Sequence, residues 1–246
     1  MNKITEAAVP KCGSSDKRNS EYEANYSTEK FFHSLIDNPK PVIFDVGAHK
    51  GESIKFFKNI FRSAEVFSFE PSPENFRELE LVANDFGTKA LNVAIGEVSD
   101  DVTFYQQDLS HLGGLLPINS NSKDSLGYAE KATNDEITVS CLTLNDVVND
   151  FEIHSIDILK VDVQGFEVGV LNGGNDALLR TKLVMIEISL YDFYGENKGT
   201  WFDVNRIMGE LGFELFDIAK VSKNPKNLRT DWVELIFLND RYSSNE

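Results

Sequence analysis

The order of apolar and polar residues predicts alternating strands and helices over most of the chain. Three short apolar runs are typical of strands buried on both faces: VIFDV (42–46), EVFSFE (65–70) and ALNVAI (90–95). The segments between them carry apolar residues at helical spacing, and the second begins with Ser72 as an N-cap before Pro73 and stops at Gly87. Because three strands joined by two helices follow closely, we expect a right-handed parallel βαβαβ unit.

The same alternation returns in the second half of the chain. Apolar runs at 156–163 and 183–190 predict strands, residues 166–180 predict a helix between them, and residues 200–211 predict another helix. Two further runs, FELFDI and WVELIFLN, predict a C-terminal hairpin that gives the sheet an antiparallel edge. The predicted fold class is therefore α/β: a doubly wound, Rossmann-like, mostly parallel sheet in a three-layer αβα arrangement.

The N-terminal segment and the longest connection lack the alternating pattern of strands and helices. Residues 1–27 are polar and lack periodicity, so we expect a flexible leader before a single domain at 28–246. Thr28 is expected to cap a short amphipathic helix at the start of that domain. Residues 107–136 are rich in Gly, Ser and Asn and are long for a connection, which is typical of a segment that is either functional or mobile.

The composition of the chain restricts the kinds of molecule that the protein is expected to bind. The chain has 24 Lys plus Arg against 40 Asp plus Glu, a formal charge of −16. Nucleic acids and anionic membranes are bound mainly by Lys and Arg, so we expect neither as a partner. No apolar run approaches the roughly 20 residues that span a bilayer, and residues 1–20 lack the apolar stretch of a secretory signal. With only Cys12 and Cys141 available for a disulfide, a cytoplasmic location is expected.

The strongest local signal is DVGAHKGE (45–52), between the first strand and the first helix. Gly47 and Gly51 allow the backbone to turn tightly and approach a ligand, and the helix start offers unpaired N–H groups. Glu70 ends the second strand, where a carboxylate can accept both hydroxyls of a ribose. These features predict a nucleoside ligand, although a strand–turn–helix junction without a ligand also uses such glycines.

Two nucleoside-type ligands fit this arrangement to different degrees. Dinucleotides usually require G-x-G-x-x-G, whereas the spacing here is G-x-x-x-G and His49 would crowd the pyrophosphate. S-adenosylmethionine has no phosphate and tolerates a side chain at that position. It needs an acidic group near its amino-acid portion, where Asp45 is placed. The loop therefore favours S-adenosylmethionine over NAD.

Several segments, taken in order, resemble the FkbM family of class I S-adenosylmethionine-dependent methyltransferases over roughly residues 40–240. They are FDVGAHKGE (44–52), FEPSPENF (69–76), LNVAIGEVSDDVTFY (91–105), TLNDVV (143–148), ILKVDVQGFEVGVLNGG (158–174) and MIEIS (185–189). LKVDVQGFE is the most diagnostic, because the family pattern reads Lys-hydrophobic-Asp-hydrophobic-Glu/Gln-Gly-x-Glu. Where the family often has Glu, this chain has Gln164, so we assign no acid–base role there.

The resemblance implies a fold, an activity and a donor site. It implies a seven-stranded sheet whose last strand runs antiparallel, and methyl transfer to a hydroxyl, often of a sugar or a secondary metabolite. Segment 107–136 and the region after residue 190 vary in such families and set the acceptor. The expected contacts to S-adenosylmethionine are Asp45, Gly47, Ala48, His49, Gly51, Ser53, Glu70, Pro71, Ser72, Asn92 and Ala94.

Two carboxylates are expected at the rim of the sheet. Asp162 closes one strand and Glu187 closes the next, and ligands gather outside the carboxyl ends of parallel strands. Asp162 is the candidate general base for the acceptor hydroxyl. Two alternatives stay open: Asp162 and Glu187 hold a divalent cation, or Lys160, on the same face as Asp162, forms a structural charge network with these carboxylates.

Other side chains are weaker candidates. His111 is a second candidate base, because an ordinary pKa of about 6.5 suits neutral pH, but a solvated loop histidine is the alternative. Tyr191, Phe193, Tyr194 and Trp201 follow the strand that carries Glu187 and either stack on a ring-shaped acceptor or pack in the core. No clustering of His and Cys points to zinc, and the oligomeric state is not determined by the sequence.

The sequence therefore predicts an S-adenosylmethionine-dependent O-methyltransferase acting on a small hydroxylated acceptor. An NAD-dependent oxidoreductase would share Glu70 but lacks the middle glycine. A non-catalytic nucleoside-binding module is the third hypothesis, and the presence of Asp45, Gly47, Gly51 and Asp162 argues against it.

Overall fold

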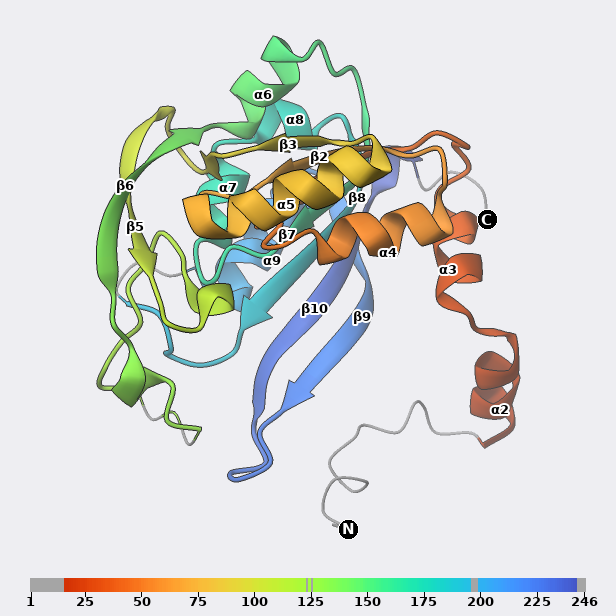
Figure 1. The fold of residues 1–246 in the computed structure, drawn as a ribbon. Coiled ribbons are helices and arrows are strands. Elements are labelled where there is room, and N and C mark those ends of the chain that lie inside the picture. The colour runs from red at the N-terminus through yellow and green to blue at the C-terminus, as the bar shows by residue number, and fades with distance from the viewer. Residues whose placement is uncertain (1–15, 123, 125, 196–198, 243–246) are drawn as a thin grey trace.

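The structure is a computed structural model that describes residues 16–122, 124, 126–195 and 199–242. A seven-stranded sheet forms its centre, with the order β3-β2-β1-β7-β8-β10-β9 (Figure 1). Its strands are β1 (Val42–Val46), β2 (Glu65–Phe69), β3 (Lys89–Leu91), β7 (Ile156–Val161), β8 (Thr181–Ser189), β9 (Phe213–Lys223) and β10 (Thr230–Asn239). The doubly wound, mostly parallel sheet predicted from the sequence is confirmed.

The C-terminal hairpin and the antiparallel last strand of a seven-stranded sheet are also confirmed, and the antiparallel strand lies one place inside the edge of the sheet. β10 runs antiparallel to both β8 and β9, so it lies inside the sheet and β9 forms the edge. β9 and β10 extend past the neighbouring strands as a long ribbon (Figure 1). This extension places the end of the hairpin beside the carboxyl end of β8, where Trp232 pairs with Ser189.

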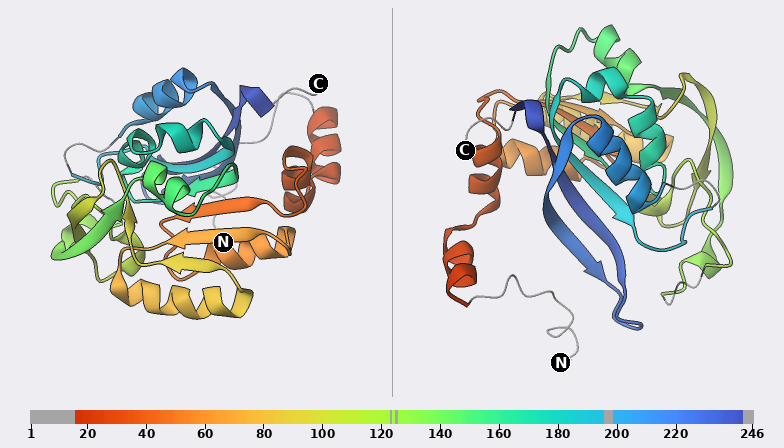
Figure 2. Two further views of the ribbon diagram at one scale, coloured as in Figure 1. Left: turned by 90° about the horizontal axis from the view of Figure 1, so that it is seen from above. Right: turned by 180° about the vertical axis from the view of Figure 1, so that it is seen from behind.

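Helices cover both faces of the sheet. α4 (Glu52–Ile60) and α5 (Pro73–Phe86) lie on one face, and α3 (Thr28–Leu35) joins that layer through Phe32. The opposite face carries α6 (Leu144–Asp150), α7 (Glu167–Asn172), α8 (Asn175–Leu178) and α9 (Trp201–Glu210), as the left view of Figure 2 shows. The expected three αβα layers are therefore present.

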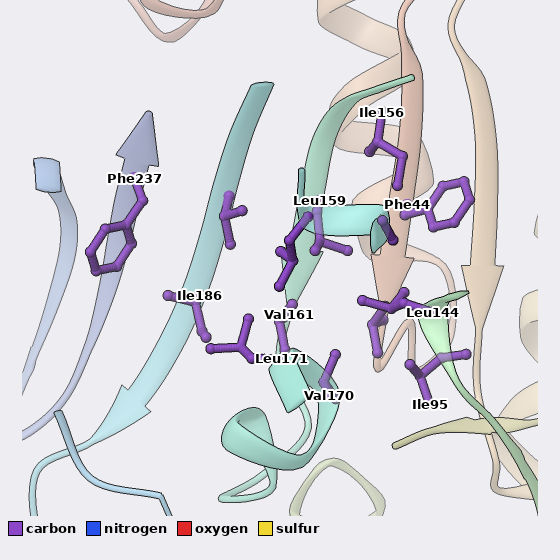
Figure 3. Close-up of a cluster of buried hydrophobic side chains, with 14 of the residues drawn as sticks. Phe44, Ile95, Leu144, Ile156, Leu159, Val161, Val170, Leu171, Ile186 and Phe237 are labelled. Atoms are coloured by element: carbon purple, nitrogen blue, oxygen red, sulfur yellow. The ribbon is translucent and has the colours of Figure 1, made fainter. Parts of the chain in front are cut away.

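Each face buries its own hydrophobic cluster because the strands alternate their side chains between the two helical layers. Figure 3 shows the cluster under α6–α9, in which Phe44, Leu159 and Ile186 of the sheet meet Leu144 and Val170 of the helices. The other face packs strand residues such as Ile43 and Ile158 against Ile54 and Phe57 of α4. Burial on both faces explains why these strands read as continuous apolar runs.

Several predicted boundaries were wrong. The run 90–95 divides, because Asn92 Nδ2 donates to the carbonyls of Glu70 (2.8 Å) and Pro71 (3.1 Å) and turns the chain out of the sheet. The residues that follow belong to a second sheet, with the order β4-β6-β5. Its strands are β4 (Ala94–Ile95), β5 (Asp100–Gln106) and β6 (Asp135–Leu142).

The predicted helix 166–180 divides into α7 and α8 where the chain passes close to the second sheet. A Cβ on Gly173 would lie 2.0 Å from the backbone oxygen of Gly96. At the N-terminal side, Ser27 rather than Thr28 caps α3, because the Ser27 hydroxyl accepts from the Lys30 N–H (3.1 Å). Within the predicted leader, Asp16–Asn25 forms helix α2, and residues 1–15 lie outside the described part of the chain.

One close backbone approach sets the geometry at the carboxyl ends of the central strands. The Asp162 N–H donates to the Val46 carbonyl (2.9 Å), which draws the end of β7 against the turn after β1. A Cβ on Gly47 would lie 1.8 Å from the backbone oxygen of Asp162, and Gly47 has φ of +82°. Only glycine satisfies both constraints, so the first glycine of the loop is required by the fold itself.

We predict that Gly47→Ala lowers the free energy of unfolding by about 3 kcal/mol or more, from left-handed strain together with the backbone clash. Gly87→Ala is the matched control, because Gly87 has φ of +62° but nothing within 4 Å of its Cβ position. That control should lose only about 1 kcal/mol from strain. Urea unfolding monitored by circular dichroism measures both, and equal losses would contradict the clash argument.

Candidate functional site

A cavity of about 580 Å³ lies at the carboxyl ends of the central strands. Val46, Phe69 and Ser189, which end β1, β2 and β8, line it, and so does Asp162 directly after β7. This is the edge at which an open α/β sheet binds its ligands, and the volume is typical of small-molecule sites. The cavity is therefore the candidate active site.

One wall is built from the turn after β1 and the end of β2. Glu70 is only 5% exposed but lines the cavity, and it accepts the backbone N–H groups of His49 (2.9 Å) and Ser72 (2.9 Å). Burial raises the pKa of Glu70 to about 7, while the Ser72 and His49 N–H groups oppose the rise. The two N–H bonds fix the carboxylate between the glycine turn and the start of α5.

The predicted donor-binding residues divide into two groups. Seven of them line the cavity: Gly47, Ala48, His49, Ser53, Glu70, Pro71 and Ala94. Asp45, Gly51, Ser72 and Asn92 do not line it, and each supports the wall from behind. Gly51 and Ser72 are the N-caps of α4 and α5, and Asn92 holds the carbonyls of Glu70 and Pro71.

Asp45 lies behind the wall as part of a buried charge network. It is fully buried, and its Oδ1 lies 3.5 Å from the Nζ of Lys160, whose Nζ also lies 3.4 Å from Asp162 Oδ2. Burial raises the pKa of Asp45, and Lys160 and the hydroxyl of Ser53 oppose this rise. Burial alone would lower the pKa of Lys160, but Asp162 and Asp45 more than offset it and raise that pKa well above its usual range. One ammonium group thus serves two carboxylates.

Asp162 is held from its other side by a hydrogen-bond chain. Gln164 Nε2 donates to Asp162 Oδ1 (2.7 Å), and the Tyr194 hydroxyl donates to Gln164 Oε1. The carboxylate is partly exposed to the cavity and has a fixed orientation between Lys160 and Gln164. Gln164, to which the sequence assigned no acid–base role, therefore lines the cavity as the donor that orients Asp162.

Glu187 lies beside Asp162 at the rim, as predicted from the strand ends. Val161 pairs with Ile186, so the next residues on β7 and β8 stand at the same level. Burial, and secondly the charge of Asp162, raise the pKa of Glu187 to about 8. Glu187 lines the cavity and is therefore a carboxyl group that titrates near neutral pH inside the candidate site.

Two histidines stand at the mouth of the cavity. His49 Nδ1 lies 3.2 Å from Glu52 Oε1 and His49 Nε2 lies 2.9 Å from Ser110 Oγ, so both ring nitrogens have partners. His111 lines the cavity with its ring 6.5 Å from that of His49. Burial and the neighbouring His49 lower the pKa of His111, and Asp162 opposes this. His111 therefore lies at the cavity wall, and its role as a site residue and a base stays a prediction.

Segment 107–136 packs over the cavity. The backbone N–H of Asn119 donates to the Phe193 carbonyl (2.8 Å), and the N–H of Gly195 donates to the Pro117 carbonyl (2.7 Å). Ile118 and Tyr194 pair as an isolated antiparallel bridge and share a small hydrophobic cluster. Residues 123 and 125 of the segment lie outside the described residues. The segment therefore forms one side of the site rather than a remote connection.

The aromatic residues after β8 lie in two different environments, the cavity wall and the core. Tyr191, Phe193 and Tyr194 line the cavity, as expected for stacking on an acceptor. Trp201 instead packs against Phe237 with the ring centroids 6.4 Å apart, as expected for a core residue. The difference arises because Trp201 begins α9, which faces the sheet, whereas the other three lie in the loop above it.

One part of the site was missed from the sequence. The end of the β9–β10 hairpin contributes Ser222, Lys223, Asp231 and Trp232 to the cavity wall. A hairpin tip is distant in sequence from every motif, and no spacing rule links it to the glycine loop. Trp232, near the start of the predicted strand, was the only local signal.

The described ranges hold neither a metal cluster nor a membrane-spanning helix. Within them, no group of three or more His, Cys, Asp or Glu side chains is arranged to hold a metal ion. Among the same residues, no helix is long and apolar enough to cross a bilayer.

We predict a pH-dependent stability effect at Glu167, a buried residue that begins α7 and accepts the Gly165 N–H (3.0 Å). Burial raises the pKa of Glu167 from 4.5 to about 7, so the folded state holds this proton more tightly than the unfolded state between those values. Relative to Glu167→Gln, the wild type should therefore lose stability as the pH rises through this window, by about 3 kcal/mol at most. Urea unfolding at pH 5 and pH 8 measures the difference, and a difference independent of pH would contradict this assignment.

Comparisons with known proteins agree with the fold. Residues 45–215 match the family model described as the methyltransferase FkbM domain. The 2-O-methyltransferase NoeI of Sinorhizobium fredii is 27% identical over 174 residues, which cover 65% of this chain and 68% of the relative. The hexuronic acid methyltransferase AglP of Haloferax volcanii is 29% identical over 149 residues, which cover 60% of this chain and 55% of the relative.

A third relative and a solved structure extend this picture. The 31-O-demethyl-FK506 methyltransferase FkbM of Streptomyces tacrolimicus is 31% identical over 167 residues, which cover 59% of this chain and 64% of that protein. The crystal structure of the methyltransferase FkbM from Methylobacillus flagellatus shares the fold, with a TM-score of 0.50 at 12% identity over 96% of this chain and 58% of that chain. The matched regions thus span between about half and two thirds of the relatives' own lengths. Because the family model covers most of the chain, this protein belongs to the FkbM methyltransferase family.

Proposed function

We propose that this protein transfers a methyl group from S-adenosylmethionine to a hydroxyl of a small acceptor, a sugar unit or a secondary metabolite. The observation that carries the proposal is the single cavity in which a nucleoside-type wall, with Glu70, faces Asp162, Glu187 and an aromatic wall. Membership of the family supports methyl transfer, and the names of NoeI and AglP support oxygen and sugar acids as the acceptor chemistry of relatives.

The residues present fit the donor. Glu70 offers a buried carboxylate at the end of β2, where its remaining lone pairs suit the two hydroxyls of a ribose. Gly47 and Ala48 bring bare backbone to the same wall, and the acidic site suits a sulfonium cation. When bound, S-adenosylmethionine supplies an electrophilic methyl carbon. We assign Asp45 to charge balance around Lys160, because it lies behind this wall.

The opposite end of the cavity fits a polyhydroxylated acceptor. Tyr191 and Trp232 contribute aromatic rings, each of which has a cation over one face, Arg229 at 4.0 Å and Lys220 at 4.7 Å. Ser189 of β8 and Ser222 of β9, the two strands that flank β10, contribute hydroxyl groups. Asp162, held rigidly by Lys160 and Gln164, is placed to accept a hydrogen bond from an acceptor hydroxyl. Catalysis in this arrangement rests on positioning the acceptor oxygen in line with the methyl group. The net charge of −16 supports a small acceptor over a nucleic acid, which such a charge repels.

The direct test is methyl transfer from tritiated S-adenosylmethionine to a panel of methyl glycosides, methyl glucuronide and hydroxylated macrolactones. We expect incorporation of the label into at least one acceptor, as an ether that resists mild base. Binding of S-adenosylmethionine without transfer to any member of the panel would favour a non-catalytic nucleoside-binding module. A thermal shift with NAD and none with S-adenosylmethionine would overturn the assignment of the donor.

We predict that Glu70→Gln weakens S-adenosylmethionine binding by tenfold or more, about 1.4 kcal/mol, because an amide oxygen cannot accept from both ribose hydroxyls as the carboxylate does. Wild-type affinity should rise from pH 6 to pH 8, since the pKa of about 7 makes the carboxylate available only above that value. This rise should be absent in the variant. Isothermal titration calorimetry measures both effects. Glu74→Gln, an exposed change in the first turn of α5, serves as the control and should bind like the wild type.

We predict that Trp232→Ala lowers kcat/KM for a saccharide acceptor by about tenfold, mainly through KM, because a stacking face is lost. Trp232→Phe should recover most of this loss, and S-adenosylmethionine affinity should not change in either variant. Initial-rate kinetics with the best acceptor of the panel measure the effect. An unchanged KM in Trp232→Ala would remove the hairpin from the acceptor site.

A further inference from the structure

Two carboxylates face the acceptor end of the cavity, and their surroundings differ. Asp162 has an ammonium at 3.4 Å on one oxygen and an amide donor at 2.7 Å on the other. Both contacts occupy lone pairs of this carboxylate and hold it in one orientation. The side chain of Glu187, in contrast, has neither a hydrogen bond nor an ion pair with any residue in the described ranges, and it lines the same cavity.

The register of the sheet explains why Glu187 is left without a partner. It stands level with Asp162 on β7 and directly opposite Glu234 on β10, so a carboxylate lies on each side of it. The nearest ammonium, that of Lys160, is already shared between Asp45 and Asp162. Like charges at facing positions of an antiparallel pair are unfavourable. The three adjacent carboxyl groups of Asp162, Glu187 and Glu234 therefore favour a protonated Glu187.

Within the described part of the chain, the charged side chains that act most on Glu187 come from three elements packed beside it. Lys160 belongs to β7, and Asp162 follows directly after that strand. Glu167 begins α7, and Glu234 lies on β10. On the far side of Glu234, Lys220 of β9 is its partner in the strand register. Tyr194 of the loop after β8 also interacts with Glu187. Burial and Asp162 raise the pKa of Glu187 to about 8, with Lys160 opposing, and a base of this strength suits proton transfer near neutral pH.

We propose that Glu187 is the general base that removes the proton of the acceptor hydroxyl, and that Asp162 holds the acceptor as a fixed carboxylate. The inference rests on the proposed methyltransferase function and names the proton acceptor at that site. As the acceptor oxygen bonds the methyl carbon, the sulfur keeps the electron pair of the breaking S–C bond, and the hydroxyl proton passes to the carboxylate of Glu187. Water in the open cavity then takes this proton, so charge and atoms balance.

The decisive variant is Glu187→Gln, which keeps the shape of the side chain. We expect kcat with the best methyl glycoside acceptor to fall by about 100-fold or more, the range that a positioned base contributes. S-adenosylmethionine affinity and the thermal midpoint should stay close to those of the wild type. The wild-type kcat should rise with pH along a limb near pH 8, and this limb should be absent in the variant.

Two neighbours provide matched controls. Glu234→Gln removes a like charge that is outside the cavity lining, so the plateau kcat should stay within about threefold and the limb should move to lower pH. Asp162→Asn should raise the acceptor KM and keep the limb, moved to lower pH by more than in Glu234→Gln because Asp162 is the larger like charge. If Asp162→Asn abolishes the limb and Glu187→Gln retains it, Asp162 is the base and our proposal is wrong.

A measurement without any acceptor separates this proposal from the proposed function. In protein labelled with carboxyl-¹³C glutamate, the resonances of Glu70, Glu167 and Glu187 should titrate with midpoints above pH 6, and the one with the highest midpoint should disappear in Glu187→Gln. Absence of that Glu187 resonance overturns the proposal even if methyl transfer is found. If the resonance is present but wild-type protein methylates no member of the acceptor panel, the proposed function fails while the electrostatic assignment stands.

Discussion

The site depends on the ammonium of Lys160, which extends from the central strand β7 and reaches the cavity. A lysine on a strand covered on both faces is costly to bury without partners, and here Asp45 of β1 and Asp162 after β7 both approach it. These contacts tie the two central strands together at the end where the backbone of Asp162 presses against Gly47. The glycine turn that forms the donor wall and the carboxylate that faces the acceptor are therefore fixed relative to each other by one interaction.

A second consequence concerns the carboxylates that Lys160 does not reach. Six acidic side chains gather around the carboxyl ends of these strands: Asp45, Glu70, Asp162, Glu167, Glu187 and Glu234. One ammonium cannot balance them, so burial and mutual repulsion favour the protonated forms of the least-paired members. The pKa values of about 7 for Glu70 and Glu167 and about 8 for Glu187 express this imbalance. The excess of acidic residues in the chain thus has a consequence at the site, because it places carboxyl groups there that titrate near neutral pH.

The sequence predicted the architecture well because the fold follows from local patterns. Continuous apolar runs marked the parallel strands, and Ser72, Pro73 and Gly87 marked the limits of α5. Boundaries were wrong where a tertiary contact decides them. Asn92 turns the chain out of the main sheet by binding the carbonyls of Glu70 and Pro71, and Gly173 ends α7 where it meets the backbone of Gly96. Neither contact can be inferred from the residues that are adjacent in sequence.

For the site, the sequence by itself determined the glycine turn, Glu70, Asp162 and Glu187, because the end of each strand carries its functional side chain to a common edge. Only the tertiary structure decided which of them face a ligand. It placed Asp45 behind the wall and brought the β9–β10 hairpin with Trp232 to the far end of the cavity. It also decided that Asp162 is paired and Glu187 is not. Spacing along the chain fixes which strand end a residue occupies, whereas its charge state and partners depend on strand order, register and burial, which are properties of the assembled sheet.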